Sequence, residues 1–427
     1  MHTLADLRAG KLAGSKRLDL SCDLTTFPDE IFSLSDSLEV LNLTGNRLTE
    51  LPADLHRLQH LKVLFCSNNP FTELPEALGQ CPELFFVGFK SCRIATVSPR
   101  ALPPRLRSLV LTDNCLASLP DELGQFPALQ KLMLAGNRLQ ELPESLVACQ
   151  HLELVRIASN RFRQLPAWLL RMPSLAWLAF SGNPLTDIHQ DTPIRQIPWA
   201  ELSLQQVLGE GASGVIQQAE WRRDNSLQNV AVKLYKGQLT SDGTPLNEMA
   251  ACIAAGQHPN LIPVEGQVLD HPEHTQALVM RLIATRFATL ARPPSLATCT
   301  RDVYEDIRLS PSTVQRIAHG IASACAHLHG RGINHGDLYA HNVLWAEPGD
   351  SLLGDFGAAA FYPDADTGFL LQRIEVQAFG ILLGELLALC DGHRPDTASL
   401  RALQAHCTQA DVGGRPGFDE VERRLAI

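Results

Sequence analysis

The sequence lacks the features that mark a secreted, membrane-spanning or disulfide-linked protein. Its first twenty residues have no apolar core of a secretory signal, and no run of about 18 apolar residues occurs. The eleven cysteines are odd in number and form no C-x-x-C pair, which favours reduced thiols inside a cell over a disulfide framework or a zinc site. We therefore expect a cytoplasmic protein that does not enter a membrane.

A surplus of positive charge is also missing. The net charge is −10; residues 1–200 carry 19 basic and 20 acidic side chains, whereas residues 201–427 carry 17 and 26. A basic face for nucleic acid or anionic lipid is therefore not expected. The length of 427 residues and the hydrophobic content of 45% predict two or three folded domains instead.

What the first half does contain is a repeat. Leucine recurs at a nearly constant interval, at Leu38, Leu61, Leu84, Leu106, Leu129, Leu152 and Leu175. The clearest copies, such as "LEVLNLTGN", "LRSLVLTDN" and "LQKLMLAGN", read L-x-x-L-x-L-x-x-N, which is the leucine-rich-repeat signature. Looser copies lie between them, and a degenerate eighth copy begins near Ser15. Because a single coil cannot bury its leucines, the coils must stack. We expect an α/β solenoid of about eight repeats over residues 1–190, similar to the short intracellular repeats with an L-P return segment.

The positions between the repeat leucines decide what the concave sheet presents. They are unusually apolar, and the large side chains among them are Phe65, Phe86, Met133, Leu154 and Trp177. A face of this kind is larger than a monomer usually leaves exposed to water, which favours binding of a protein partner or substrate. The alternative is that these residues pack against the chain's own second domain or are simply tolerated while exposed.

A second set of motifs follows a polar connector over residues 191–200. It begins with the glycine-rich "LGEGASGVIQQA" and continues with "NVAVKLYK", a helix that carries Glu248, "HGDLYAHN" and "LLGDFGAAA". In this order the motifs resemble those of eukaryotic-type protein kinases. The resemblance covers residues 201–427 and implies an α+β bilobal kinase fold, with ATP and Mg²⁺ as cofactors.

The resemblance also implies a role for each matching residue. Lys233, held by Glu248, would contact the nucleotide phosphates, Asp337 would orient the acceptor hydroxyl and take its proton, and Asn342 and Asp355 would bind Mg²⁺. His335 and Phe356 would stack to align the lobes. The nucleotide itself would lie among Leu208, Gly209, Gly211, Gly214, Ile216, Ala231, Lys233, Leu344 and a hinge running from Met280 to Ile283.

The catalytic loop departs from the family pattern at two positions. Gly336 replaces an arginine that binds an activation-loop phosphate in many kinases, so we expect Gly336→Arg to change little. Tyr339 replaces a lysine that neutralises the γ-phosphate, and His341 could supply part of the missing positive charge.

The segment after "DFG" is short. Glu375 follows Asp355 by only 20 residues, and no A-P-E motif occurs. Arg415 matches the arginine that pairs with the A-P-E glutamate in the family, so it must bond elsewhere. Only Tyr362 and Thr367 offer hydroxyls between Gly357 and Arg373. Most of the peptide-docking platform is therefore missing.

Three functions remain open on this evidence. The glycine-rich loop, "AVK", "HPNLI" and "RPGF" favour an ATP-dependent protein kinase, preferably for serine or threonine, with the repeats recruiting a partner or substrate. The shared H-G-D-x-x-x-x-N pattern and the short docking segment also fit a small-molecule kinase of the aminoglycoside type. A pseudokinase scaffold that acts through its repeats is the third possibility.

Overall fold

The computed structural model describes residues 2–186, 193–211, 213–223, 226–237, 239–390 and 397–426. The chain divides into two compact units, Met1–Ser174 and Leu175–Ile427. Within the described ranges, no helix is long and apolar enough to cross a membrane. Each unit is described on its own below.

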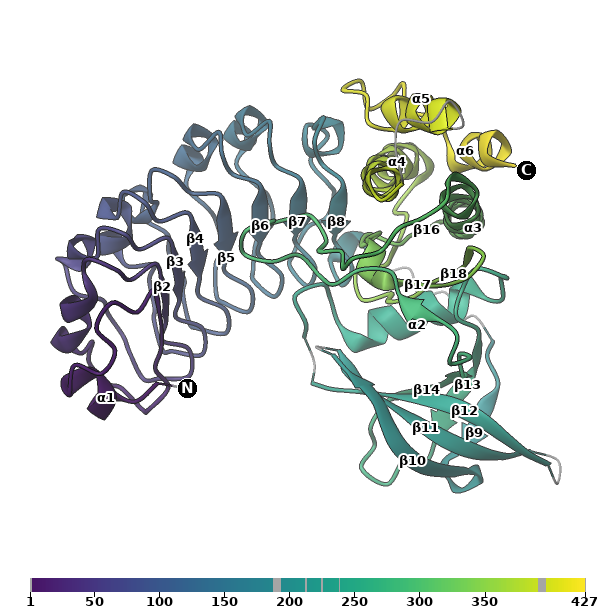
Figure 1. Ribbon diagram of the computed structural model, residues 1–427, viewed down its shortest axis with the longest axis horizontal. Coiled ribbons are helices and arrows are strands. Elements are labelled where there is room, and N and C mark those ends of the chain that lie inside the picture. The colour runs from purple at the N-terminus through teal and green to yellow at the C-terminus, as the bar shows by residue number, and fades with distance from the viewer. Residues whose placement is uncertain are drawn as a thin grey trace. The chain divides into compact units, whose positions relative to one another are not determined.

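The first unit is a leucine-rich-repeat solenoid in which each coil contributes one short strand (Figure 1). After helix α1 (Leu4–Arg8), the strands pair in parallel and in chain order: β1 (Arg17–Asp19), β2 (Val40–Asn42), β3 (Val63–Phe65), β4 (Phe86–Gly88), β5 (Ser108–Val110), β6 (Lys131–Met133) and β7 (Leu154–Arg156). Short 3₁₀ helices lie between the strands: η1 (Asp29–Leu34), η2 (Leu55–Arg57), η3 (Glu76–Gln80), η4 (Pro99–Ala101), η5 (Asp121–Gln125), η6 (Glu144–Ala148) and η7 (Leu169–Arg171). The predicted solenoid is confirmed.

The repeat asparagines form a buried ladder that satisfies backbone groups where each coil turns. The Asn69 side-chain oxygen accepts the Leu48 amide at 2.9 Å, and its side-chain nitrogen donates to Leu43 O at 2.9 Å and to Cys66 O at 3.0 Å. Asn137 makes the same three kinds of bond further along the solenoid. Because buried backbone groups are costly when unpaired, this ladder explains why the asparagine recurs with the leucines.

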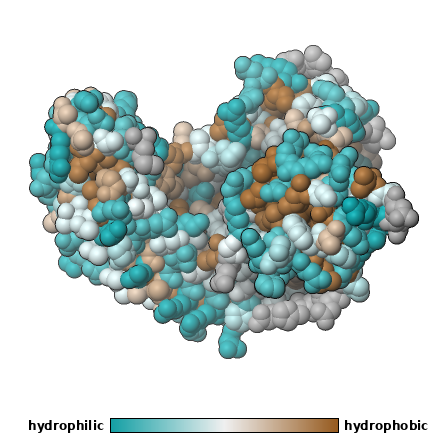
Figure 2. Space-filling view, turned by 90° about the horizontal axis from the view of Figure 1, so that it is seen from below, coloured by the Kyte–Doolittle hydropathy of each residue, from teal (hydrophilic) through white to brown (hydrophobic). Residues whose placement is uncertain are grey.

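Part of the predicted concave face is accessible. Phe65, Phe86 and Met133 are half-buried, and the Phe65 and Phe86 rings lie 4.9 Å apart. Gly88 leaves room for them, because a Cβ there would lie 3.1–3.2 Å from both rings. On the side of Figure 2 that shows the repeats, hydrophobic patches lie among hydrophilic residues.

Two residues of this predicted face are not available to a partner. Trp177 is 1% exposed and Leu154 is 4% exposed, so the prediction that they are presented for binding is wrong. Trp177 lies in β8 (Trp177–Ala179), which belongs to the second compact unit, where its indole is covered by that unit's own side chains. For Trp177 the alternative weighed from the sequence, packing within the chain, is the correct one.

The second unit has two parts (Figure 1). One is a six-stranded sheet in the order β10-β11-β12-β14-β13-β9, with helix α2 (Pro245–Ala255). Its strands are β9 (Gln196–Pro198), β10 (Leu202–Glu210), β11 (Gly214–Arg223), β12 (Ser226–Tyr235), β13 (Val264–Leu269) and β14 (Ala277–Arg281). Trp221, Val232 and Val279 are fully buried in the core of this sheet.

The other part of the second unit is mainly helical. Its helices are α3 (Pro311–Gly330), α4 (Ala365–Ala388), α5 (Ala398–Cys407) and α6 (Phe418–Leu425). Two small antiparallel sheets join it: β15 (Ala288–Thr289), β17 (Val343–Ala346) and β18 (Asp350–Leu353) form one, and β16 (Ile333–Asn334) and β19 (Ala360–Phe361) form the other. The 3₁₀ turns of this unit are η8 (Pro184–Thr186), η9 (Trp199–Glu201) and η10 (Ala340–Asn342). A sheet-containing part and a helical part are the two lobes that the sequence predicts.

The predicted connector has structure of its own. Residues 196–198 form β9, which pairs in parallel with β13, and the Trp221 indole donates to the Glu201 carboxylate at 3.0 Å. Residues 191 and 192 lie outside the described residues. Along the chain, the first compact unit ends at Ser174, whereas the repeats are predicted to end at residue 190. A division into compact units does not define where the repeats end, so the predicted domain limits stay a prediction.

Candidate active site

A buried ion pair links the sheet to helix α2. Lys233 Nζ on β12 contacts Glu248 Oε1, and the two side chains are only 12% and 3% exposed. Burial alone would lower the pKa of Lys233, but the charges of Glu248 and Asp355 outweigh it and raise that pKa. The lysine therefore stays charged, and its side chain lines a cavity next to the sheet.

That cavity collects residues from several predicted motifs. Lys233, Glu248, Ile216, Met280 and Asp355 all line it, and its apolar wall includes Cys252, Leu261 and Phe356. A mostly apolar pocket with a few converging charges is the usual form of a small-molecule site. The remaining predicted adenine contacts are placed only partly: Ala231 is buried and pairs with Met280, and Leu344 lies on β17.

The three glycines of the glycine-rich loop differ in their surroundings. A Cβ on Gly209 or Gly211 would meet nothing within 4 Å, so the backbone there borders open space that a ligand can enter. A Cβ on Gly214 would instead lie 2.5 Å from Leu234 O, so this glycine is required by strand packing. Gly211 and Gly214 line a second, more polar cavity together with Lys233, Asp242 and Asp355.

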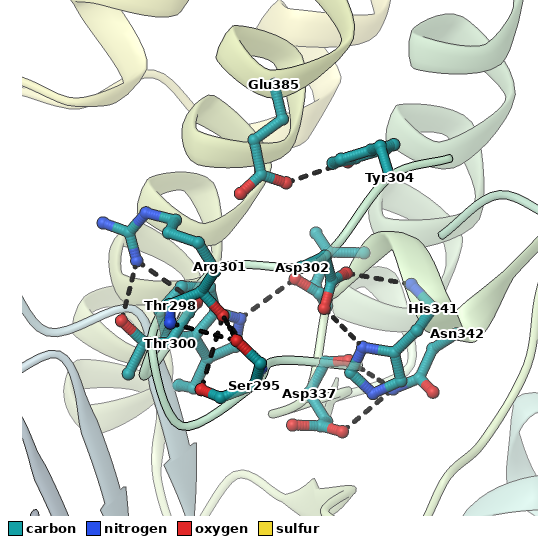
Figure 3. Close-up of polar contacts among 12 residues, drawn as sticks. Ser295, Thr298, Thr300, Arg301, Asp302, Tyr304, Asp337, His341, Asn342 and Glu385 are labelled. Carbon is teal, nitrogen blue, oxygen red and sulfur yellow. Dashed lines mark hydrogen bonds and ion pairs between the residues drawn. The ribbon is translucent and has the colours of Figure 1, made fainter. Parts of the chain in front are cut away.

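The catalytic loop holds Asp337 and Asn342 together. The Asn342 side-chain nitrogen donates to Asp337 Oδ2 and to Asp337 O, both at 2.9 Å (Figure 3). The Gly354 amide donates to Asn342 O at 2.9 Å, and His335 Nε2 lies 2.9 Å from Gly354 O. These bonds join the loop to the "DFG" segment, where the His335 and Phe356 rings lie 5.2 Å apart.

The oxygen groups at this junction suit Mg²⁺. Asp355 is exposed toward the cavities, and the Asn342 side chain is fixed by its two bonds to Asp337. Among the described residues, no cluster of three or more His, Cys, Asp or Glu side chains is arranged to hold a metal ion. A carboxylate and an amide oxygen, completed by nucleotide phosphates and water, fit the preference of Mg²⁺ for few protein ligands.

Asp302, which no sequence motif indicates, contacts the catalytic loop from a separate segment. Asp302 lies in the irregular segment between β15 and α3, with a side chain that is 0% exposed. Its carboxylate accepts the His341 amide at 3.0 Å and contacts His341 Nδ1 at 2.8 Å (Figure 3). No motif or spacing marks Asp302, because the contact joins segments that lie far apart in the sequence.

The same carboxylate favours a charged His341. Burial would lower the pKa of this imidazole, but its bond to Asp302 and the charges of Asp302, Asp337 and Asp355 raise it. The structure thus supports the idea that His341 brings positive charge to the loop in which Tyr339 replaces lysine.

Gly336 is required by its backbone and by close neighbours. Its φ is +75°, and a Cβ would lie 2.7 Å from Ala358 O and 2.9 Å from Leu178 O. Its amide donates to Glu375 Oε1 at 2.8 Å, and His329 Nε2 lies 2.6 Å from Glu375 Oε2. The expectation that Gly336→Arg would change little is therefore wrong: no Cβ fits there.

The short segment after "DFG" ends at helix α4. The helix begins at Ala365, with Asp364 as its N-cap, so Thr367 lies in its first turn and its hydroxyl donates to Asp364 Oδ2 at 2.8 Å. Arg415 is 2% exposed and donates to Gln409 O at 3.0 Å and to Arg373 O at 3.2 Å. Arg415 does bond elsewhere, as predicted, and both of these acceptors are backbone carbonyls.

Family models match segments in both halves of the chain. The model for "Protein tyrosine and serine/threonine kinase" matches residues 202–368. Leucine-rich-repeat models match residues 36–80, 104–162 and 127–185.

Several curated relatives are protein kinases. Mitogen-activated protein kinase kinase kinase 13-A of Xenopus laevis is 26% identical over 214 residues, which is 45% of this chain and 19% of that protein. The probable serine/threonine-protein kinase gdt4 of Dictyostelium discoideum is 30% identical over 38% of this chain and 9% of its own length. Serine/threonine-protein kinase TAO1-B of Xenopus laevis is 27% identical over 38% of this chain and 15% of its own length. The matched segments thus span less than a fifth of each relative.

Proposed function

We propose that this chain, which has leucine-rich repeats N-terminal to a protein kinase domain, is an ATP-dependent kinase that phosphorylates serine or threonine in proteins. The observation that carries the proposal is one cavity lined by Lys233, Glu248 and Asp355. Lysine and a metal-binding carboxylate are the groups that position nucleotide phosphates, and the buried glutamate keeps the lysine in place.

Each residue then has a task in the reaction. Lys233 binds the α- and β-phosphates, and the open backbone at Gly209 and Gly211 lies over them. Asp337 orients the acceptor hydroxyl and takes its proton, with its carboxylate fixed by Asn342. Mg²⁺, when bound at Asn342 and Asp355, would neutralise the phosphate charge. His341 adds a cation next to Asp337 in place of the missing lysine.

The choice of acceptor is supported by likeness alone. Two of the relatives described above are named serine/threonine kinases, and the loop "DLYAHN" lacks the A-A-R or R-A-A letters of tyrosine kinases. A small-molecule acceptor is the competing outcome, because the docking segment is short.

Measurement of ATP consumption by the full chain distinguishes these acceptors. With Mg²⁺ present, we expect transfer to serine or threonine in generic protein substrates or in the chain itself, located by mass spectrometry. Turnover of small amines or alcohols, with none on proteins, would overturn the protein-kinase proposal. Failure to bind ATP·Mg²⁺ in a thermal-shift titration would leave only a scaffold role.

Leucine-rich repeats generally serve protein interactions, and we further propose that the accessible part of the concave face recruits the substrate. Phe65 and Phe86 are half-buried, in ring contact, and carried by adjacent strands. Burying one large apolar side chain contributes about 1.5–3 kcal/mol, so a few such residues suffice for micromolar binding. We expect Phe65→Asp with Phe86→Asp to abolish phosphorylation of a protein in trans and to spare autophosphorylation. Unfolding of the repeats, or unchanged trans activity, would contradict this role.

A further inference from the structure

The catalytic loop is covered by a stack of aromatic rings that begins outside it. Trp177, in the last repeat strand β8, stacks on Tyr339 with ring centroids 4.2 Å apart and planes 7° from parallel. The Tyr339 ring in turn lies 5.0 Å from the His341 ring. The planes of the Tyr339 and His341 rings are tilted by 34°. We call Trp177, Tyr339 and His341, joined by these two ring contacts, the aromatic clamp.

Both ends of the aromatic clamp are held by neighbouring residues of one segment. The Arg301 guanidinium lies over the Trp177 ring at 5.5 Å, and Asp302 binds the His341 backbone amide and Nδ1. The contacts therefore run from Arg301 through the three rings to Asp302, and because Arg301 and Asp302 are consecutive residues, the chain of contacts forms a closed ring. Such a ring restrains the loop more than separate contacts would, because a residue in it cannot move without breaking its contacts on both sides.

The aromatic clamp grips the part of the loop that matters for transfer. The residues it holds, from Leu338 to His341, are those between Asp337 and Asn342. Trp177 Nε1 also donates to Leu338 O at 3.0 Å, so the indole fixes the backbone next to Asp337 as well as the Tyr339 ring. Trp177 is 1% exposed and Tyr339 is 5% exposed, so both rings of the stacked pair are buried.

Gly336 gives an independent sign of the same packing. The nearest backbone atoms that a Cβ there would meet include Leu178 O, which belongs to β8 beside Trp177. The backbone of the repeat strand thus occupies the space next to the residue before Asp337. Any side chain at position 336 would therefore collide with the backbone of β8.

We propose that Trp177 is a positioning residue for phosphoryl transfer: through the aromatic clamp, strand β8 holds the catalytic loop in its working geometry without a phosphate on the segment after "DFG". The proposal rests on the proposed kinase function. The last repeat is then part of the catalytic apparatus, whichever protein the other repeats bind. A carboxylate displaced by about 1 Å costs on the order of 100-fold in rate, so even modest loosening is measurable.

The test compares three variants of the full chain. Trp177→Ala removes the stack and the bond to Leu338, and Trp177→Phe keeps a ring but removes the bond. Trp199→Ala is the matched control, because it also removes a ring contact, to His271 at 4.3 Å, but one in the sheet-containing part of the unit. We expect kcat for phosphotransfer to fall about 10- to 100-fold in Trp177→Ala and less in Trp177→Phe, with KM for ATP unchanged. Trp199→Ala should keep the wild-type kcat.

Hydrogen exchange supplies a readout that does not need activity. Amides of residues 336–342 should exchange faster in Trp177→Ala than in wild type, and should not change in Trp199→Ala. If wild type transfers no phosphate, the proposed function fails, and the exchange experiment still decides whether the aromatic clamp holds the loop. Unchanged kcat and unchanged exchange in folded Trp177→Ala would overturn the proposal, and so would a raised kcat, which would make β8 a restraint on activity. Should Trp177→Ala not fold, Trp177→Phe and Asp302→Ala take its place: kcat should be lower and loop exchange faster than in wild type in both variants, and wild-type behaviour in either would overturn the proposal.

Discussion

The nucleotide side and the acceptor side of the candidate active site are built in different ways. On the nucleotide side, Lys233 and Glu248 form the ion pair that the family pattern implies, and the pair lies within one sheet-and-helix part of the chain. On the acceptor side, the docking segment is short, the loop arginine is Gly336, and Asp302 and Trp177 support the loop instead. The comparison teaches that the groups proposed to bind nucleotide follow the family pattern, whereas the surroundings of Asp337, the proposed base, depart from it.

The largest expected effect is on the acceptor side. Asp337→Asn should lower the phosphotransfer rate by about 10²–10⁴-fold, because the amide cannot take the acceptor proton. The affinity for ATP·Mg²⁺ should hold, measured by titration alongside the rate. Asp350→Asn serves as the control, since Asp350 is half-exposed and pairs with Arg286 at the surface. If Asp337→Asn lowered the affinity for ATP·Mg²⁺ as much as it lowered the phosphotransfer rate, the distinction between the nucleotide side and the acceptor side would be wrong.

The nucleotide side should respond in both binding and stability. Lys233→Met leaves Glu248 buried without its partner, which should cost about 3–5 kcal/mol in the free energy of unfolding and remove ATP binding. Lys236→Met is the matched control: Lys236 pairs with Glu210, but the side chains are 42% and 62% exposed, so the loss should stay within about 1 kcal/mol. Chemical denaturation measures both. An equal loss of unfolding free energy in Lys233→Met and Lys236→Met would show that burial does not make the Lys233–Glu248 pair more important than the Lys236–Glu210 pair.

Gly336 should be less sensitive than the ion pair but clearly more so than an ordinary glycine. Gly336→Ala must strain a φ of +75° and move two backbone oxygens, which should cost about 1–3 kcal/mol and slow transfer. Gly330→Ala, at the end of α3, meets nothing within 4 Å and should be neutral. Thermal unfolding of both variants checks this, and a stable, fully active Gly336→Ala would mean that β8 does not pack there.

The smallest effect concerns acid stability beneath the catalytic loop. Burial would raise the pKa of Glu375, but the bond from His329, nearby imidazole charges and the Gly336 amide lower it below the ordinary 4.5. Because the folded pKa is depressed, the carboxylate stabilises the fold above pH about 4.5, and this contribution is lost as the pH falls through the folded value. Tm measured against pH should fall less steeply below pH 4.5 in Glu375→Gln than in wild type. Parallel curves would show that Glu375 does not contribute.

The sequence predicts best what local spacing determines. The repeat strands follow from leucines at a nearly constant interval, and the asparagine ladder follows from the same spacing, because each coil contacts only its neighbours. The two lobes and the placement of Lys233 opposite Glu248 follow from ordered motifs whose separations are typical of kinases.

Long-range packing explains what the sequence could not predict. Trp177 occupies the same repeat position as Phe86, yet one is buried on the catalytic loop and the other is half-buried in the repeat face. The repeat pattern is the same at both positions, and the deciding contact joins Trp177 to Leu338, far along the chain. The need for glycine at position 336 cannot be predicted from the sequence for the same reason, since its φ and the approach of Leu178 O depend on the folded chain. The kinase resemblance begins at residue 201, so it does not include β8 or β9, although both strands belong to the second compact unit.

The most direct test of the central claim is the intact mass of dephosphorylated full-length chain after incubation with ATP and Mg²⁺, in parallel with Asp337→Asn. The account predicts that wild type gains phosphoryl groups on serine or threonine, while the variant gains none and still binds the nucleotide. A wild-type chain that binds ATP·Mg²⁺ but transfers no phosphate to itself or to any protein would contradict it.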